Sequence, residues 1–196
     1  MGRDKALLPW PPSTSGGVSR ETFLSAAIQM LSPYVEMVLV VVGKNEDALA
    51  LVVYAQGASV VVNPDPARGQ FSSLQTGLHD VLNRGRDAAM ITLVDRPPVK
   101  ATTIETLEAA FQEAAQQGKW AVVPEYQGKH GHPIIAGREM IEAFLRAVDG
   151  SNAREVEHAH SDKIAYITVD DPAVVGNVDT PEQYAALSAE RTGNVS

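Results

Sequence analysis

Two aspartates stand at positions where loops commonly carry catalytic groups. Asp95 follows Ala88–Val94, an apolar run without alternation that predicts a buried strand covered on both faces, and Asp179 lies in the segment N-V-D-T-P. Ligands of open α/β sheets bind beyond the carboxyl ends of the strands. Mg²⁺ takes one or two carboxylates, keeps several waters and fills its other positions with phosphate oxygens. A converging pair would suit a phosphate-transferring site, although a turn or a helix cap explains each aspartate alone.

Cationic and hydroxyl groups that suit a phosphorylated ligand occur in two further segments. Lys5, together with Arg3, precedes a short apolar patch and could neutralise a triphosphate, although a solvated surface lysine is the alternative. The segment N-P-D-P-A-R-G-Q-F-S-S-L (Asn63–Leu74) predicts a loop and then a helix that Ser72 or Ser73 caps. Such a helix start offers N–H groups and hydroxyls to a ribose or phosphate oxygen, and simple capping is the other interpretation.

A histidine metal site is the competing interpretation. The pairs His130/His132 and His158/His160 are each separated by one residue, and alternate residues of a strand share a face. Four imidazoles could bind zinc, copper or nickel. No acid stands inside either pair, and the glycine and proline around His132 are typical of a loop that shapes a substrate site, so magnesium chemistry is favoured. No serine-hydrolase, P-loop or zincin motif is present.

The composition restricts the classes of partner. The chain has 196 residues, of which 44% are hydrophobic and 20% are charged, and this suits one globular domain. The net charge is −8 without a basic run, which argues against binding polymeric nucleic acid. The absence of cysteine excludes disulfides, iron–sulfur clusters and thiolate zinc sites. We find no signal peptide and no run of membrane-spanning length, so we expect a cytoplasmic protein without membrane association.

Apolar periodicity and chain breakers predict alternating helices and strands. Strands are expected at Met37–Val42, Ala58–Val62, Ala88–Val94, Trp120–Val123, Ile134–Ala136 and Ile164–Val169. Helices are expected from the cap Ser19 to the residues before Pro33, at Glu46–Gln56, after Ser72 or Ser73, from Thr102 or Thr103 to Gln117, at Arg138–Val148 and after the cap Thr180. Right-handed βαβ units predict a largely parallel three-layer α/β/α sandwich in a single domain, residues 1–196, with an antiparallel element added after His130.

Five segments of the chain resemble the MobA-like nucleotidyltransferases, most closely the branch that includes molybdenum cofactor cytidylyltransferase. M-G-R-D-K-A-L-L-P (Met1–Pro9) is similar to the end of the family signature L-A-A-G-x-S-x-R-M-G-x-x-K-x-L-L-P. N-P-D-P-A-R-G-Q-F-S-S-L-Q-T-G-L (Asn63–Leu78) resembles N-P-x-x-x-x-G-M-x-S-S-L-x-x-G-L, and V-D-R-P-P-V (Val94–Val99) resembles the metal-binding turn G-D-x-P-x-V. G-H-P-I-I and N-V-D-T-P-E-Q-Y resemble the later substrate loop and the second metal aspartate.

The resemblance implies a fold and a reaction. The fold would be a mostly parallel, Rossmann-like sheet of the nucleotide-diphospho-sugar transferase type. A phosphorylated acceptor, a molybdopterin-type cofactor, would attack the α-phosphorus of an NTP, CTP ahead of GTP, and release pyrophosphate. Lys5 would contact the triphosphate, while Asp95 and Asp179 would hold Mg²⁺. Positioning and charge neutralisation, rather than a covalent nucleophile, would drive this chemistry. The oligomeric state stays open, and a homo-oligomer is compatible with the sequence.

The resemblance also implies which residues surround the substrates. Ser72 and Ser73 would lie near the base and the ribose, and Asn63 would lie at the edge of the nucleotide pocket. Arg3 would join Lys5 at the phosphates. The acceptor side would be lined by Gly131, His132 and Pro133.

The chain departs from the family pattern in its first residues. The buried strand and glycine-rich loop L-A-A-G-x-S-x-R, which cradle the triphosphate, are absent from the sequence, so we expect a domain truncated at its N-terminus with two exposed sheet edges. Two hypotheses follow: an enzyme whose start lies upstream of Met1, and a degenerate nucleotide-binding or assembly protein without catalysis. Val94 also replaces the usual glycine of the metal-binding turn, and Arg96 follows Asp95, where it could contact a phosphate or pair with Asp95.

Overall fold

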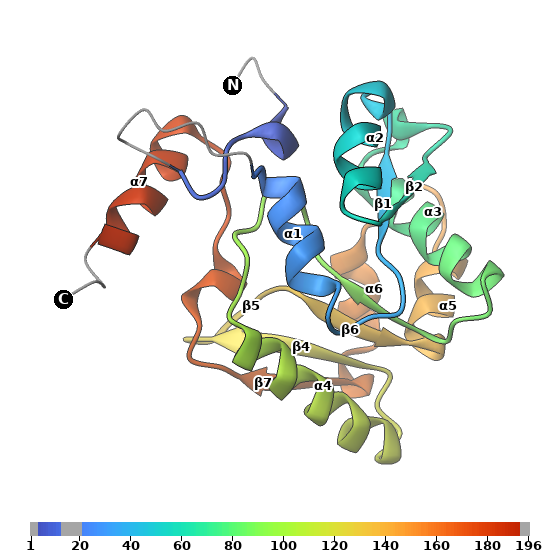
Figure 1. The fold of residues 1–196 in the computed structure, drawn as a ribbon. Helices are drawn as coiled ribbons and strands as arrows, with labels where there is room; N and C mark the ends of the chain where they lie inside the picture. The colour runs from blue at the N-terminus through green and yellow to red at the C-terminus, as the bar shows by residue number, and fades with distance from the viewer. Residues whose placement is uncertain (1–3, 13–20, 193–196) are drawn as a thin grey trace.

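The computed structural model describes residues 4–12 and 21–192, and Figure 1 shows their arrangement. The strands are β1 (Leu39–Val42), β2 (Ser59–Val62), β3 (Ala88–Ile91), β4 (Ala121–Tyr126), β5 (Lys129–His130), β6 (Ile134–Gly137) and β7 (Ile164–Thr168). The α-helices are α1 (Phe23–Leu31), α2 (Glu46–Ala55), α3 (Gln70–Asn83), α4 (Ala101–Gln116), α5 (Arg138–Arg146), α6 (Ala153–Ala159) and α7 (Pro181–Thr192). Short 3₁₀ helices are η1 (Lys5–Leu7), η2 (Pro66–Arg68), η3 (Ser161–Lys163) and η4 (Pro172–Val175).

The helices cover both faces of the strands, which confirms the predicted α/β/α layers. On one face, Leu24 and Ile28 of α1 and Leu49 and Val53 of α2 pack on the valines of β1. On the same side of the neighbouring sheet, α4 packs on β4, β6 and β7. The opposite face is covered by α3, α5 and α6. Gly77 of α3 lies so close to Val41 that an added Cβ would be 2.8 Å from its side chain, so this glycine lets α3 approach β1.

The strands form two separate sheets. β1 pairs with β2 in parallel, and the second sheet has the order β3-β6-β4-β5, with β7 on the other edge of β4. Strands β3, β4 and β7 run in one direction, because β6 is antiparallel to β3 and β4 while β7 is parallel to β4. The reversed β5 and β6 form the antiparallel element expected after His130. Among the described strands, β1 and β3 each have one hydrogen-bonded neighbour, so each leaves one edge unpaired.

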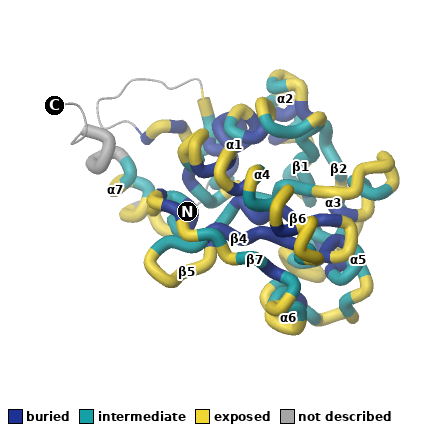
Figure 2. The backbone as a smooth tube through the Cα atoms, turned by 90° about the horizontal axis from the view of Figure 1, so that it is seen from below, coloured by how far each residue is buried: buried dark blue, intermediate teal, exposed yellow. Residues whose placement is uncertain are grey.

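Burial differs between the two sheets. Figure 2 shows β4 as buried, whereas β1 and β2 are mostly of intermediate exposure. The predicted buried strand Ala88–Val94 is wrong in two respects. β3 ends at Ile91, which pairs with Ile134 of β6. The residue before Ile134 is Pro133, which has no N–H to donate, so the pairing of the two strands stops there. Its residues are exposed or half-buried, because one edge of β3 has no neighbouring strand among the described residues.

Two predicted helix caps are also wrong. Gly69, with φ of 92°, precedes α3, so Ser72 and Ser73 lie inside its first turn. Lys100 precedes α4, and Thr103 instead donates from its hydroxyl to the buried carboxylate of Asp171, which also accepts the Lys100 backbone N–H. A distant acid therefore replaces the local threonine cap. The start of α7 is as predicted, because the Thr180 hydroxyl accepts the backbone N–H of Gln183.

The second histidine pair does not lie on a strand. His158 belongs to α6, and His160 follows its last residue, so alternation on a strand face does not apply to them. His130 lies in β5 and stacks on Tyr166 with 4.0 Å between the ring centroids. Within the described residues, no group of three histidine, aspartate or glutamate side chains is arranged to hold a metal ion. Nor does any described helix have the length and apolar character needed to cross a membrane.

Candidate active site

The loop after β3 and the segment before α7 lie side by side and carry the two aspartates. The backbone N–H of Val178 donates to the carbonyl of Asp95 over 3.0 Å. One guanidinium nitrogen of Arg96 donates to the carbonyl of Gly176 over 2.9 Å. Gly176 itself packs on Pro97, where an added Cβ would be 2.8 Å from the proline ring. The two segments are therefore interlocked, and Arg96 spans them instead of pairing with Asp95.

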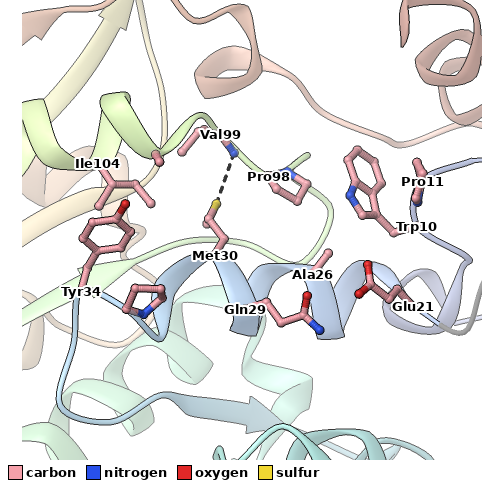
Figure 3. A pocket seen from close by; sticks show the side chains of 12 residues that line it. Trp10, Pro11, Glu21, Ala26, Gln29, Met30, Tyr34, Pro98, Val99 and Ile104 are labelled. Atoms are coloured by element: carbon pink, nitrogen blue, oxygen red, sulfur yellow. Dashed lines mark hydrogen bonds between the residues drawn. The ribbon is translucent and has the colours of Figure 1, made fainter. Parts of the chain in front are cut away.

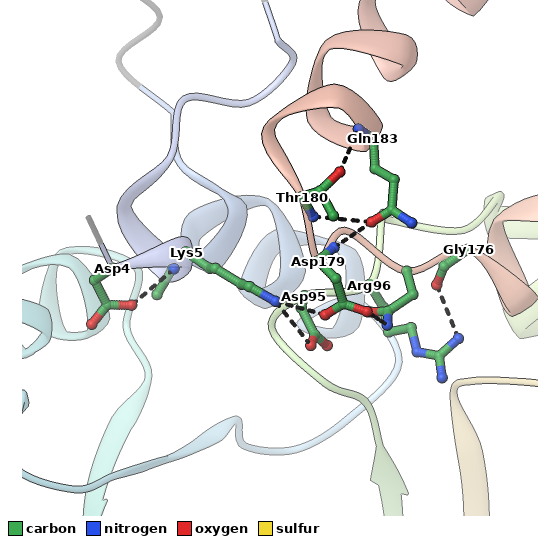
Figure 4. Close-up of polar contacts among 10 residues, drawn as sticks. Asp4, Lys5, Asp95, Arg96, Gly176, Asp179, Thr180 and Gln183 are labelled. Atoms are coloured by element: carbon green, nitrogen blue, oxygen red, sulfur yellow. Dashed lines mark hydrogen bonds and ion pairs between the residues drawn. The ribbon is translucent and has the colours of Figure 1, made fainter. Parts of the chain in front are cut away.

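The Lys5 ammonium group lies between the two carboxylates. Its Nζ is 2.8 Å from Oδ1 of Asp179 and 3.8 Å from Oδ2 of Asp95. Figure 4 shows the Lys5 side chain pointing toward both aspartates. The side chains of Lys5 and Asp95 are 31% and 25% exposed, and that of Asp179 is 53% exposed. Three residues that are far apart in the sequence thus meet at one partly open position.

Lys5 is positioned by the short helix η1 and its cap. The carboxylate of Asp4 accepts the backbone N–H of Ala6 over 3.0 Å, and its second oxygen accepts a hydrogen bond from the side chain of Asn45 at the start of α2. Ala6 is buried against α1 and α2. Sequence reasoning missed these roles of Asp4 and Asn45. The signal was an acidic residue immediately before a short apolar turn, which is a common helix cap.

Asp179 keeps its carboxylate free of the helix cap. The side-chain oxygen of Gln183 accepts the backbone N–H groups of Asp179 and Thr180, and Thr180 supplies the reciprocal cap. Oδ2 of Asp179 instead accepts a hydrogen bond from the Asn177 side chain. The alternative in which Asp179 caps α7 with its side chain is therefore wrong, and Asn177 is a further positioning residue that the sequence analysis did not identify.

The two carboxylates have the chemistry of a divalent-cation site. Oδ1 of Asp95 is buried and has no hydrogen-bond partner among the described residues, which is costly for an ionised oxygen unless a cation or water meets it. Two carboxylates that approach the same ammonium group fit Mg²⁺ or Mn²⁺, whose other positions are filled by water and phosphate oxygens. The donor set consists of oxygen atoms, as these hard cations prefer.

The side chains of Asn63, Ser72 and Ser73 form hydrogen bonds with other groups of the protein. The Asn63 side-chain amide donates to Oγ of Ser72 over 2.9 Å and to Oγ of Ser73 over 3.0 Å, and its oxygen accepts the N–H of Asp65. Ser72 is buried and donates to the carbonyl of Gly69. Ser73 is half-buried. Within the described residues, no hydrogen bond or ion pair joins these three residues to the carboxylate pair.

The loop that contains Gly131, His132 and Pro133 packs under η4. The Gly131 N–H donates to the Pro124 carbonyl, and the His132 N–H donates to the Val174 carbonyl, each over 2.9 Å. A Cβ on Gly131 would be 2.0 Å from the Val174 carbonyl oxygen, so no larger residue fits. Gly131 and Pro133 are buried and shape the loop, while the His132 ring reaches the carbonyl at the end of β3.

His132 is neutral at physiological pH. Burial of the ring lowers the pKa of His132 to about 4, and the nearby Arg96 guanidinium contributes to the decrease. The hydrogen bond to the Ile91 carbonyl and the charge of Asp95 oppose this shift of the pKa without reversing it. The ring is therefore held as a neutral hydrogen-bonding group close to Asp95.

One expected site residue and one cavity remain. Arg3, the other expected phosphate contact, lies outside the described residues. A cavity of about 430 Å³ lies between α1 and the start of α4, where Met30, Tyr34 and Val99 form part of its wall (Figure 3). None of the site residues predicted from the sequence lines this cavity. The Val99 N–H within it faces the sulfur of Met30 at 3.2 Å.

Comparison with sequence families identifies one match. Residues 1–164 match the family described as the MobA-like NTP transferase domain. A curated relative, the molybdenum cofactor cytidylyltransferase of Escherichia coli (strain K12), is 21% identical over 196 residues, which cover 98% of this chain and 91% of the relative.

Solved structures show the same fold. Rv0371c from Mycobacterium tuberculosis H37Rv, in a complex with manganese, superimposes with a TM-score of 0.74 and 22% identity over 96% of this chain and 93% of that one. Molybdopterin-guanine dinucleotide biosynthesis protein A from Archaeoglobus fulgidus superimposes with a TM-score of 0.68 and 15% identity over 98% of this chain and 92% of that one. At these identities, the similarity establishes the fold.

Proposed function

The chain belongs to the MobA-like NTP transferase family and is a nucleotidyltransferase, and on that premise we propose that it moves CMP from CTP to a phosphorylated acceptor. The acceptor proposed is a molybdopterin-type cofactor, and the divalent ion is Mg²⁺. The cytidylyltransferase of E. coli supports this choice of nucleotide and acceptor, as does the resemblance of the S-S-L and G-H-P segments to the same branch.

The observation that carries the proposal is the meeting of Lys5, Asp95 and Asp179 at one partly open position. Asp95 and Asp179 would hold the ion, and the orphaned Oδ1 of Asp95 supports a ligand at this position. The manganese bound to Rv0371c is consistent with a divalent ion in proteins of this fold. When bound, Mg²⁺ supplies positive charge to the phosphates of the nucleotide.

The proposed reaction transfers a cytidylyl group without a covalent enzyme intermediate. A phosphate oxygen of the acceptor forms a bond to the α-phosphorus of CTP, while the bond from that phosphorus to the bridging oxygen breaks and pyrophosphate leaves with its electron pair. Lys5 can place its ammonium group on the phosphates, where it stabilises the negative charge of the leaving group. The interlocked loops hold Asp95 and Asp179 in fixed positions, which aligns the reacting atoms.

The acceptor is proposed to approach beside the loop of Gly131, His132 and Pro133. The neutral His132 ring lies close to Asp95 without adding positive charge there, and because its Nδ1–H donates to the Ile91 carbonyl, its Nε2 can accept a hydrogen bond from an incoming group. Ser73, which is half-buried, remains the proposed contact to the nucleotide, with Arg3 at the phosphates. Asn63 and Ser72 are proposed to support the nucleotide pocket from inside the protein.

The test is the release of pyrophosphate from CTP in the presence of Mg²⁺ and molybdopterin-type acceptor. Asp95→Asn is expected to lower the rate by about 10², equivalent to roughly 3 kcal/mol of transition-state stabilisation. Asp162→Asn removes an exposed carboxylate that pairs with Lys163, and it is the matched control with an unchanged rate. A rate for Asp95→Asn within a few-fold of the parent would contradict the role of Asp95, and a preference for GTP would contradict the choice of nucleotide.

A further inference from the structure

Both carboxylate oxygens of Asp179 already have a hydrogen-bond partner. Oδ1 accepts from the Lys5 ammonium group at 2.8 Å, and Oδ2 accepts from the Asn177 side chain. Figure 4 shows the Lys5 side chain extended from η1 to the two aspartates. Each oxygen has a second lone pair, but a divalent ion shared by Asp95 and Asp179 would enter the position between the carboxylates that the Lys5 ammonium group occupies, and the two cations would repel each other.

Lys5 is the donor that can leave. Its side chain is 31% exposed, and it has a long flexible stem, whereas Asn177 is short and only two residues away from Asp179. The backbone of Lys5 stays fixed, because η1 is capped by Asp4 and anchored by the buried Ala6. An ammonium group released from the carboxylates consequently remains tethered at the site.

The Arg96 guanidinium does not replace Lys5. The Arg96 guanidinium donates to the Gly176 carbonyl and has no ion pair with Asp95 or Asp179 within the described residues. Loss of Lys5 from the carboxylates would thus leave two negative charges close together, which is unfavourable until another cation arrives. The released ammonium group regains an ion pair only when it meets new negative charge.

We propose that Lys5 is a displaceable counter-ion of the carboxylate pair, so that a divalent ion enters together with a nucleotide whose phosphates take over the ammonium group. This inference rests on the function proposed above. Free divalent ion binds weakly because it competes with Lys5. The metal–nucleotide complex binds well because it supplies a cation to the aspartates and an anion to Lys5 in the same step. The physiological ligand is then the metal–nucleotide complex.

The test measures the binding of Mn²⁺ alone and of the Mn²⁺–CTP complex to the same set of variants. Free Mn²⁺ is followed by electron paramagnetic resonance, and the nucleotide complex by calorimetry. Lys5→Met is expected to bind Mn²⁺ alone about tenfold more tightly than the parent, because the competing charge is gone. The same variant is expected to bind Mn²⁺–CTP about tenfold more weakly, because a phosphate contact is lost. Displacement therefore predicts that Lys5→Met binds Mn²⁺ alone more tightly and Mn²⁺–CTP more weakly than the parent.

Two further variants separate this effect from general electrostatics. Lys163→Met removes the same charge from an exposed ion pair with Asp162, and it should change neither affinity. Lys5→Arg retains a cation and should keep the weak binding of Mn²⁺ alone. The gain in Lys5→Met should also shrink as the salt concentration rises, since salt screens the competing charge.

The outcomes distinguish this inference from the proposed function. Unchanged or weaker binding of Mn²⁺ alone to Lys5→Met, with Mn²⁺–CTP binding that still depends on Asp95, overturns the counter-ion role and leaves the nucleotidyltransferase site intact. An equal gain in Lys163→Met also overturns it, because the effect is then one of net charge. If neither Mn²⁺ nor Mn²⁺–CTP binds to any variant, both the inference and the proposed function fail.

Discussion

The carboxylate pair and the Asn63–Ser73 segment carry equally recognisable motifs, yet the structure uses them in different ways. Asp95 presents a buried oxygen without a partner among the described residues, and it shares the Lys5 ammonium group with Asp179. In contrast, the Asn63 amide is buried and satisfied by Ser72, Ser73 and the Asp65 N–H. The carboxylate pair thus retains a hydrogen-bond acceptor for a ligand, whereas the polar groups of the Asn63–Ser73 segment mostly bond to one another.

This difference indicates which residues of a motif bind a ligand and which stabilise the fold. A buried polar group with all its partners contributes to stability, and its loss is measured as unfolding free energy. A polar group that lacks a partner points to something that binds there. We therefore expect substitutions around Asn63 to affect stability first, and substitutions of the carboxylates to affect binding and rate first. We expect substitutions in the loop of Gly131 and His132 to affect both stability and binding, because this loop supports the carboxylate region through packing.

The largest effect on stability is expected for Gly131→Ala. The new Cβ would lie 2.0 Å from the backbone carbonyl of Val174, which cannot rotate away, so about 3 kcal/mol of unfolding free energy should be lost. Gly57→Ala is the matched control, because its φ is 72° while no atom lies within 4 Å of the added carbon. It should cost about 1 kcal/mol from backbone strain alone. Urea denaturation measures both, and equal losses would show that η4 yields to the clash.

The pH dependence of stability should reveal the buried His132. Its pKa is lowered from the ordinary value of 6.5 to about 4 in the folded protein, so the folded state favours the neutral ring. The resulting stability is complete above pH 6.5 and is lost as the pH falls towards 4, with a total of about 3 kcal/mol. Urea denaturation at several pH values should show a shallower decrease for His132→Asn than for the parent. His130→Asn, in which the exposed ring of β5 is removed, should retain the full decrease.

The smallest effect should come from the internally satisfied segment. Asn63→Ala leaves the Ser72 and Ser73 hydroxyls without their donor, and it should cost about 2 kcal/mol of unfolding free energy. The affinity of the folded variant for Mn²⁺ should stay unchanged, since no hydrogen bond or ion pair connects the described residues of this segment to the carboxylates. Calorimetry on the folded fraction checks this point. A tenfold loss of Mn²⁺ affinity would remove the distinction between the two regions.

Local patterns predicted the elements of this fold more reliably than their connections. Apolar runs located β1 and β4 to within a few residues, and the T-P-E-Q sequence located the start of α7. The cap of α4 could not be predicted from its own threonines, because Asp171, far along the chain, supplies it. The division into two sheets also depends on pairing between distant strands, which periodicity does not specify.

The candidate site was predictable as a set of residue types but not as an arrangement. Asp95, Asp179 and Lys5 could be named from their motifs, and nothing in their spacing required a shared contact. Positioning by Asn177 and Asp4 needs the folded backbone, because Asn177 acts through a hydrogen bond across a turn, and Asp4 acts through one bond within η1 and one to Asn45 at the start of α2. Likewise, the hydrogen bonds of Ser72 to Asn63 and to the Gly69 carbonyl, which support its proposed role inside the pocket wall, could not be read from the motif.

The most direct test of a shared ion is a double-mutant cycle on Asp95 and Asp179, read out as Mn²⁺ affinity in the presence of CTP. If the two carboxylates hold the same ion, Asp95→Asn and Asp179→Asn should each weaken Mn²⁺ binding by at least about tenfold, and the double variant should lose far less than the sum of the two. Fully additive losses, or an affinity that either single variant leaves unchanged, would contradict a single ion held between Asp95 and Asp179.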